Sequence, residues 1–232
     1  MSNSLPTINL KNDLSVDKKL EKIWSDYNSN SDQEQLSGLF QKDVLKNVVT
    51  YLSLNPSLQP KDRANAQKGN YPAVPYNLID WNRPNAEYKF FQKFYDLGKE
   101  INPWTILDLL YIRESNQDEL KKKFSSNSIS DHNKTFVVSQ MKLTFSILKE
   151  LNPKVVVVTN ALTVLLIKIF SQELQLKHEV PIGSNGNIYR INGIPFITNE
   201  SKFLGSRIHS LNIPRRESLI KEIKRVLETT QS

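Results

Sequence analysis

The chain has 232 residues, of which 38% are hydrophobic and 24% are charged, values typical of a globular protein with a packed core. It carries 31 Lys and Arg against 24 Asp and Glu, a formal net charge of +7, and it contains no cysteine. Disulfides, a thiol nucleophile and cysteine-held zinc or iron–sulfur clusters are therefore excluded. The basic balance is compatible with a nucleic-acid partner, because phosphate neutralisation requires Lys and Arg.

The chain shows no signal for a membrane or for secretion. No apolar run approaches the roughly 18 residues needed to cross a bilayer, and the first residues lack the basic and apolar regions of a secretory signal. We expect a soluble cytoplasmic protein that is a monomer and does not contact a membrane. The three histidines, His132, His178 and His209, show no ligand spacing, so neither a metal site nor a cofactor is expected.

The chain begins with a polar, aperiodic stretch. Residues 1–14 are expected to form a flexible arm, and residues 15–232 a single domain. Apolar side chains over 16–27 fall on one face of a helix, which predicts the first amphipathic element.

The next part of the chain contains two predicted strands separated by a long loop. A β-branched run over 47–52 predicts a strand that ends in a turn at Asn55. Residues 57–85 are rich in proline and show no clear periodicity, and loops of this length are usually functional or mobile. Helical spacing returns over 90–97, and residues 106–112 predict a second buried strand.

The second half of the chain alternates between helix and strand. After a Ser- and Asn-rich linker over 124–133, apolar spacing predicts a helix over 136–151. The four valines at 155–158 are typical of a parallel strand that is buried on both faces, and a second apolar helix follows over 161–170.

The last predicted elements are a hairpin and a helix. Asn192-Gly193 lies between two apolar pairs and predicts a β-hairpin over 188–197 with a type I′ turn. Pro214 opens a final amphipathic helix. Strands that alternate with helices indicate an α/β fold, with a mostly parallel central sheet and helices on both faces.

Three segments taken in order resemble the uracil-DNA glycosylase superfamily. VVTYLSLNPS (48–57) is similar to the water-activating motif of the mismatch-specific and single-strand-selective branches, which have a Gly-x-Asn-Pro-Gly/Ser pattern there. ELNPKVVVVTNA (150–161) and INGIPFITNESKFLGSRI (191–208) resemble the helix–strand segment of that superfamily and its hairpin before the minor-groove loop. The resemblance covers residues 45–225 and implies a single α/β domain that acts on DNA.

The resemblance also implies roles for four residues. Asn55 stands at the position that orients the attacking water, although it could instead form only an Asx-type turn before proline. Asp108 stands where the superfamily keeps an asparagine that reads the edge of uracil; an ionised aspartate only accepts hydrogen bonds, so a base with an amino group suits it better. Alternatively, Asp108 pairs with Arg113 or a backbone amide. Tyr76 is expected to stack on the flipped base, and Asn199 to donate to a base oxygen.

The loop that follows the hairpin is expected to approach DNA. Ser201 belongs to the substrate-binding set, Lys202 and Arg207 are expected to neutralise phosphates, and Leu204 to act as an apolar wedge or as part of the core. Glu200 departs from the superfamily pattern, because its carboxylate would repel phosphates.

The sequence therefore predicts a protein that resembles DNA glycosylases and hydrolyses the N-glycosidic bond of a damaged or mispaired base, with DNA as its partner. Two alternatives are a noncatalytic relative of the same fold that binds nucleic acid, and an unrelated α/β hydrolase. The chain contains no P-loop, Gly-x-Gly-x-x-Gly or Gly-x-Ser-x-Gly motif to favour another nucleotide-binding or hydrolase family.

Overall fold

The structure is a computed structural model. It describes residues 6–29, 39–55, 74–76, 97–114, 116–125, 129–179, 188–198 and 213–229. The helices in these residues are α1 (Val16–Asn28), α4 (Gln117–Phe124), α5 (Asp131–Leu151), α6 (Ala161–Ile169) and α7 (Ile213–Thr229). The strands are β1 (Thr7–Asn9), β2 (Leu39–Gln41), β3 (Asp43–Leu45), β4 (Val49–Ser53), β5 (Val74–Tyr76), β6 (Trp104–Asp108), β7 (Val155–Val158), β8 (His178–Glu179), β9 (Ile188–Ile191) and β10 (Ile194–Ile197).

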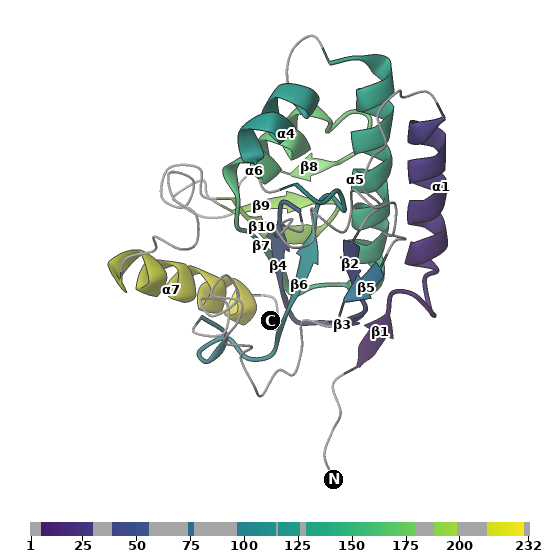
Figure 1. Ribbon diagram of the computed structural model, residues 1–232. Helices are drawn as coiled ribbons and strands as arrows, with labels where there is room; N and C mark the ends of the chain where they lie inside the picture. Colours follow the sequence, from purple (N-terminus) through teal and green to yellow (C-terminus); the bar gives the residue numbers. More distant parts are fainter. Residues whose placement is uncertain are drawn as a thin grey trace.

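The central sheet has six strands in the order β6-β4-β7-β10-β9-β8 (Figure 1). β4 is parallel to both β6 and β7, β7 is parallel to β10, and only β9 and β8 run antiparallel to their neighbours. The fold class is therefore α/β with a mostly parallel sheet, as the sequence predicts. β4 precedes β6 and β7 in the chain but lies between them, so the direction of winding changes at this point of the sheet.

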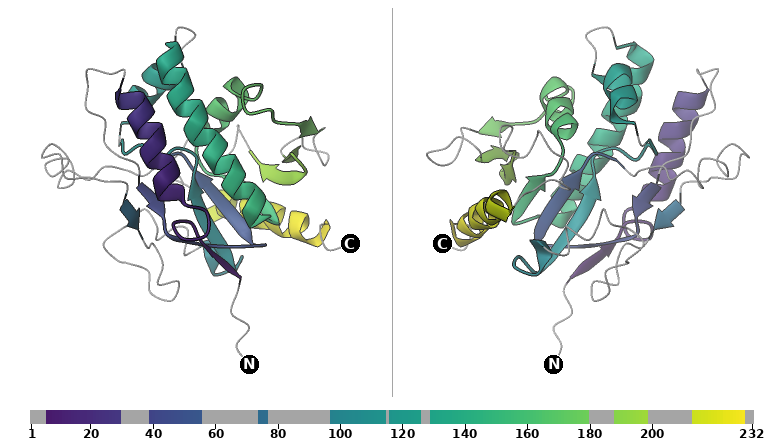
Figure 2. Two further views of the ribbon diagram at one scale, coloured as in Figure 1. Left: turned by 90° about the vertical axis from the view of Figure 1, so that its right-hand side faces the viewer. Right: turned by 60° about the vertical axis from the view of Figure 1, so that its left-hand side comes forward.

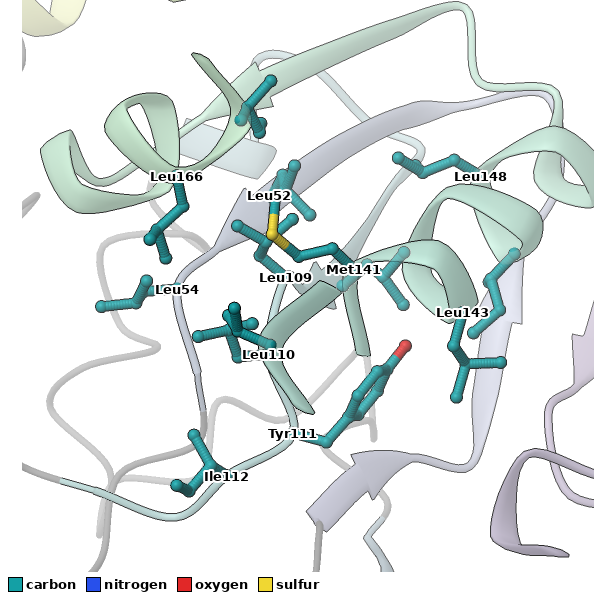
Figure 3. Packing of buried hydrophobic residues seen from close by; sticks show 14 of the residues in the cluster. Leu52, Leu54, Leu109, Leu110, Tyr111, Ile112, Met141, Leu143, Leu148 and Leu166 are labelled. Carbon is teal, nitrogen blue, oxygen red and sulfur yellow. The ribbon is translucent and has the colours of Figure 1, made fainter. Parts of the chain in front are cut away.

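Helices cover both faces of the sheet. Alternate side chains of β4 belong to different cores: Leu52 packs with α5 and α6, whereas Tyr51 packs with α7. α7 lies on the opposite side of the sheet from α5, and α1 packs outside α5 (Figure 2). Figure 3 shows the larger core, where leucines at the ends of β4 and β6 meet Met141 and Leu148 of α5 and Leu166 of α6.

The amino-terminal segment corrects one prediction. Residues 7–14 are not a flexible arm, because β1 pairs antiparallel with β3 and Leu10 is fully buried. The backbone N–H of Leu10 donates to the carbonyl of Lys42 at 2.7 Å, and the Asn9 side chain donates to Asp43 at 2.7 Å. Ile8 and Leu10 alternate into the core, and this short period-two signal is masked in the sequence by the polar residues around it.

The hairpin prediction is confirmed. β9 and β10 pair antiparallel, and both residues of the turn have positive φ, 52° for Asn192 and 80° for Gly193, as a type I′ turn requires. The predicted helices at 16–27, 136–151 and 161–170 are also present, as α1, α5 and α6, while α5 begins five residues earlier, after the N-cap Ser130. Within the part of the chain that the structure describes, no helix is long and apolar enough to cross a membrane.

Candidate functional site

The candidate site lies at the edge where the parallel strands β4, β6 and β7 end. In open α/β sheets, ligands bind outside the carboxyl ends of the strands, at the point where the winding direction changes. Here that point lies between β4 and β7. The two strands remain hydrogen-bonded at this edge, because the backbone N–H and Oγ1 of Thr159 lie 3.0 and 3.1 Å from the carbonyl oxygen of Leu52. Two of the residues expected in the site lie at this edge: Asp108 is the last residue of β6, and Asn55 follows the end of β4.

Asp108 is held by a serine that the sequence analysis did not identify. Asp108 is the register partner of Ser53 across the parallel pair β4–β6, and the Ser53 hydroxyl donates a hydrogen bond to Asp108 Oδ1. The two residues are 7% and 5% exposed, so the pair is nearly removed from water. Strand alternation places both side chains on the α7 face, next to Tyr51 and Ile106. A carboxylate in these surroundings needs such a donor.

The backbone around Asp108 is fixed by α5. Thr144 Oγ1 lies 3.1 Å from the carbonyl oxygen of Asp108 and 3.0 Å from that of Leu109. The same hydroxyl lies 3.0 Å from the phenolic oxygen of Tyr111, whose side chain points toward α5 (Figure 3). Burial raises the pKa of Tyr111 far above its ordinary value, the hydrogen bond to Thr144 lowers it, and the charge of Asp108 raises it. The end of β6 is thus a rigid, buried polar network.

Asn55 links the ends of the two strands. Its side-chain Nδ2 donates to the carbonyl oxygens of Ile112 at 2.9 Å and of Glu114 at 2.8 Å. Both N–H donors of the amide are therefore used to hold the segment that follows β6. This fixes the orientation of the side chain, so any further role of Asn55 falls to Oδ1, which only accepts hydrogen bonds.

The other expected site residues lie wholly or partly outside the described residues. Asn199, Ser201, Lys202, Leu204 and Arg207 belong to this group. The backbone of Tyr76 ends β5 in register with Gln41, but its side chain is not among those described. β10 ends at Ile197 beside β7, so Asn199 follows a strand of the same edge.

The site can be compared with known chemistry and known proteins. Among the described residues, no group of three or more His, Cys, Asp or Glu could hold a metal ion. The polar groups at this edge are the buried carboxylate of Asp108 with its Ser53 hydroxyl partner and the oriented side-chain amide of Asn55. The sequence matches no protein-family model and no curated protein. The relationship to the uracil-DNA glycosylase superfamily thus stays a hypothesis that rests on the sequence motifs.

Proposed function

We propose that the protein hydrolyses the N-glycosidic bond between a base and its sugar in DNA, at the carboxyl edge of β4 and β6. The reaction passes through an oxocarbenium-like sugar, so the site must position a water and bind a base turned out of the stack. The orientation of Asn55 is the observation that carries the proposal. With both N–H donors of the amide committed to Ile112 and Glu114, Oδ1 is the atom that accepts a hydrogen bond from the attacking water.

Asp108 supplies the second part of the proposed site. The Ser53 hydroxyl donates to its Oδ1, and we propose that the side chain acts toward the base as a carboxylate, which only accepts hydrogen bonds. Such a group suits an exocyclic amino group and disfavours the O4 oxygen of uracil. We therefore propose a damaged or unpaired base that carries an amino group, rather than uracil in a duplex, as the substrate.

The proposed rate is modest. An amide oxygen orients water but is a negligible base, so the site lacks the contribution of a carboxylate general base. General acid–base catalysis typically supplies about 10²- to 10⁴-fold. The net charge of +7 supports DNA as the partner, because Lys and Arg neutralise its phosphates.

A second candidate function follows from the same contact. The two hydrogen bonds from the Asn55 amide to Ile112 and Glu114, called the Asn55 clamp below, also have a purely structural use. They hold the end of β4 against the segment that follows β6. A noncatalytic protein that binds nucleic acid through this edge would keep the clamp for that reason.

Base release from a panel of lesions, in single- and double-stranded oligonucleotides, distinguishes these functions. We expect release of amino-bearing bases by the full chain, little release of uracil from duplex DNA, and loss of release in Asn55→Ala. Asn12→Ala, which removes an exposed amide near β1, is the matched control and should keep full activity. Robust uracil excision that survives Asn55→Ala would mean that the catalytic residue lies elsewhere, and release of no base at all would favour the noncatalytic function.

A further inference from the structure

We propose that Gln140 is a positioning residue for the proposed reaction, because it holds the chain that follows β6 in the place where Asn55 binds it. The inference rests on the proposed function in one respect, namely that the Asn55 amide orients the attacking water. It goes further by assigning the orientation of that amide to a residue of α5. Gln140 acts only through Tyr111 and Ile112 and does not contact the reacting atoms.

The chain that follows β6 passes from one hydrogen-bonding partner to the next. At first it is still bound to the chain that continues β4, and the last ladder bond described there runs from the N–H of Leu110 to the Leu54 carbonyl, at 2.8 Å. The N–H groups of the next two residues point to α5 instead. The regular sheet therefore ends before the residues that the Asn55 clamp binds.

Gln140 replaces β4 as the acceptor for these two residues. Its Oε1 accepts from the backbone N–H of Tyr111 at 2.8 Å and from that of Ile112 at 3.2 Å. One turn further along α5, Thr144 Oγ1 lies 3.0 Å from the Leu109 carbonyl oxygen, so the same face of the helix holds the chain at two successive points. Gln140 is fully buried, and water therefore cannot take the place of its oxygen.

Ile112 connects Gln140 to Asn55. The N–H of Ile112 donates to Gln140, whereas its carbonyl oxygen accepts from Asn55 Nδ2 at 2.9 Å. The second acceptor of the clamp, the Glu114 carbonyl at 2.8 Å, lies two residues further along the chain. Without the Gln140 oxygen, two buried N–H groups lose their acceptor, so the chain has to shift to satisfy them. Both acceptors of the Asn55 amide shift with it, and the amide loses its fixed orientation.

The Asn55 side chain itself reports on this positioning, independently of catalysis. Its Nδ2 protons are hydrogen-bonded, so in wild type they should exchange slowly with solvent, and Asn55→Ala identifies their NMR signals by removing them. In Gln140→Leu we expect these protons to exchange about tenfold faster in the folded protein. Gln140→Glu, which keeps an oxygen at the acceptor position, should retain slow exchange.

The proposed reaction supplies a second readout. A misplacement of about 1 Å can cost about 100-fold in rate, so base release under single-turnover conditions should be about 10- to 100-fold slower in Gln140→Leu. Affinity for the oligonucleotide should change by less than about threefold, because Gln140 acts on the reaction and not on DNA binding. Gln140→Glu should restore the rate.

A matched control separates positioning from general loss of stability. Ile223→Ala removes a fully buried side chain from the core under α7, on the opposite face of the sheet from α5, and it should also destabilise the protein. We expect it to leave the exchange of the Asn55 protons and the rate of release by the folded protein unchanged. If Gln140→Leu does not fold, Gln140→Asn takes its place, because its amide is one methylene shorter and does not reach the two N–H groups.

The outcomes can be told apart from those of the base-release assay. Slow exchange of the Asn55 protons that persists in Gln140→Leu, or equally fast exchange in Ile223→Ala, would overturn the positioning role of Gln140. Faster exchange and slower release only when Gln140 is replaced would support it. Faster exchange without release of any base by wild type would still support Gln140 as the residue that orients Asn55, and would overturn the glycosylase proposal.

Discussion

The side-chain oxygen of Gln140 accepts a hydrogen bond from the backbone N–H of Tyr111 at 2.8 Å. The same oxygen accepts from the N–H of Ile112 at 3.2 Å, and Nε2 of the amide lies 3.4 Å from the Phe136 carbonyl oxygen within α5. The ladder between β4 and β6 ends just before this point, at Leu110. A fully buried glutamine on a helix thus satisfies two N–H groups of the chain that runs on from β6 toward the Asn55 clamp.

Replacing Gln140 should therefore destabilise the protein. In Gln140→Leu, two buried N–H groups lose their acceptor, and each unsatisfied group costs about 1–3 kcal/mol. We expect the free energy of unfolding, measured by urea denaturation, to fall by about 2–6 kcal/mol. Thr135→Ala, an exposed change on the same helix, should alter it by less than about 0.5 kcal/mol. A Gln140→Leu variant as stable as this control would mean that the two groups find other acceptors.

Asn55→Asp should lower activity, although aspartate is the better general base. In the folded protein the amide donates to the carbonyl oxygens of Ile112 and Glu114, and an aspartate would place a carboxylate oxygen against one or both of them. The loss of two donors and the added repulsion should reduce the free energy of unfolding by about 2–4 kcal/mol.

Thermal unfolding and base release are measured together on Asn55→Asp and Asn55→Ala. Because the aspartate adds repulsion to the same loss of donors, we expect Asn55→Asp to be the less stable of the two. A faster and equally stable Asn55→Asp would show that the clamp is dispensable and that the position accepts a carboxylate.

The contact between Gly98 and Trp104 predicts a strong steric effect. A Cβ at Gly98 would lie 1.8 Å from Nε1 of the Trp104 indole, which is itself packed edge-on against Tyr51 with the ring centroids 5.5 Å apart. Gly98→Ala must therefore displace the indole, and overpacking of this kind costs about 1–3 kcal/mol or more.

A double-mutant cycle with Trp104→Leu checks the origin of this cost. Leucine removes the atoms that the new methyl group meets, so the two changes should be non-additive by at least about 1 kcal/mol. Gly193→Ala is the matched contrast, because it has nothing within 4 Å and a φ of +80°, so its cost comes from backbone strain and should add to that of Trp104→Leu. Additive behaviour of Gly98→Ala would place the clash elsewhere.

Two buried tyrosines predict loss of stability at alkaline pH. Burial raises the pKa of Tyr51 and of Tyr111 far above the ordinary value of about 10. Above that pH the unfolded chain releases these phenolic protons and the folded chain keeps them, so their contribution is present below about pH 10 and is lost as pH rises. The urea midpoint should fall steeply above about pH 10, and less steeply in Tyr111→Phe. Phenolate absorbance that develops fully before unfolding would contradict this.

The elements that could be predicted from the sequence are those with a strong local signal. Three elements are determined by patterns of about 20 residues or fewer: the four valines of β7, the apolar spacing of α5 and the Asn192-Gly193 turn. α4 was not predicted, because only Leu120 and Phe124 of its eight residues are buried apolar side chains. Its formation depends on packing against the rest of the core and on the Asn116 N-cap.

The sequence predicted that Asn55 and Asp108 lie at the carboxyl ends of sheet strands, but not what they contact. The structure confirms these two positions, since Asp108 ends β6 and Asn55 follows β4. The partners of these residues are 55 to 59 positions away along the chain, in the Ser53–Asp108 and Asn55–Glu114 contacts. Such contacts depend on strand order and register, which are set by how the whole sheet packs and not by the local pattern.

The last prediction concerns DNA affinity, which should be weak and strongly dependent on salt. The proposed contacts come from scattered Lys and Arg, and Glu200 lies in the sequence segment that resembles the DNA-contacting loop of the superfamily. Each phosphate contact adds about 0.9 to the slope of log affinity against log salt, so the dissociation constant should rise at least about tenfold between about 50 and 200 mM salt.

Glu200→Arg should bind an oligonucleotide severalfold more tightly and steepen this slope. Glu21→Arg makes the same change in net charge on the exposed face of α1, which packs outside α5 (Figure 2), and should have a much smaller effect. Equal gains from the two variants would show that only net charge matters, and an affinity that does not change with salt would rule out phosphate contacts as its source.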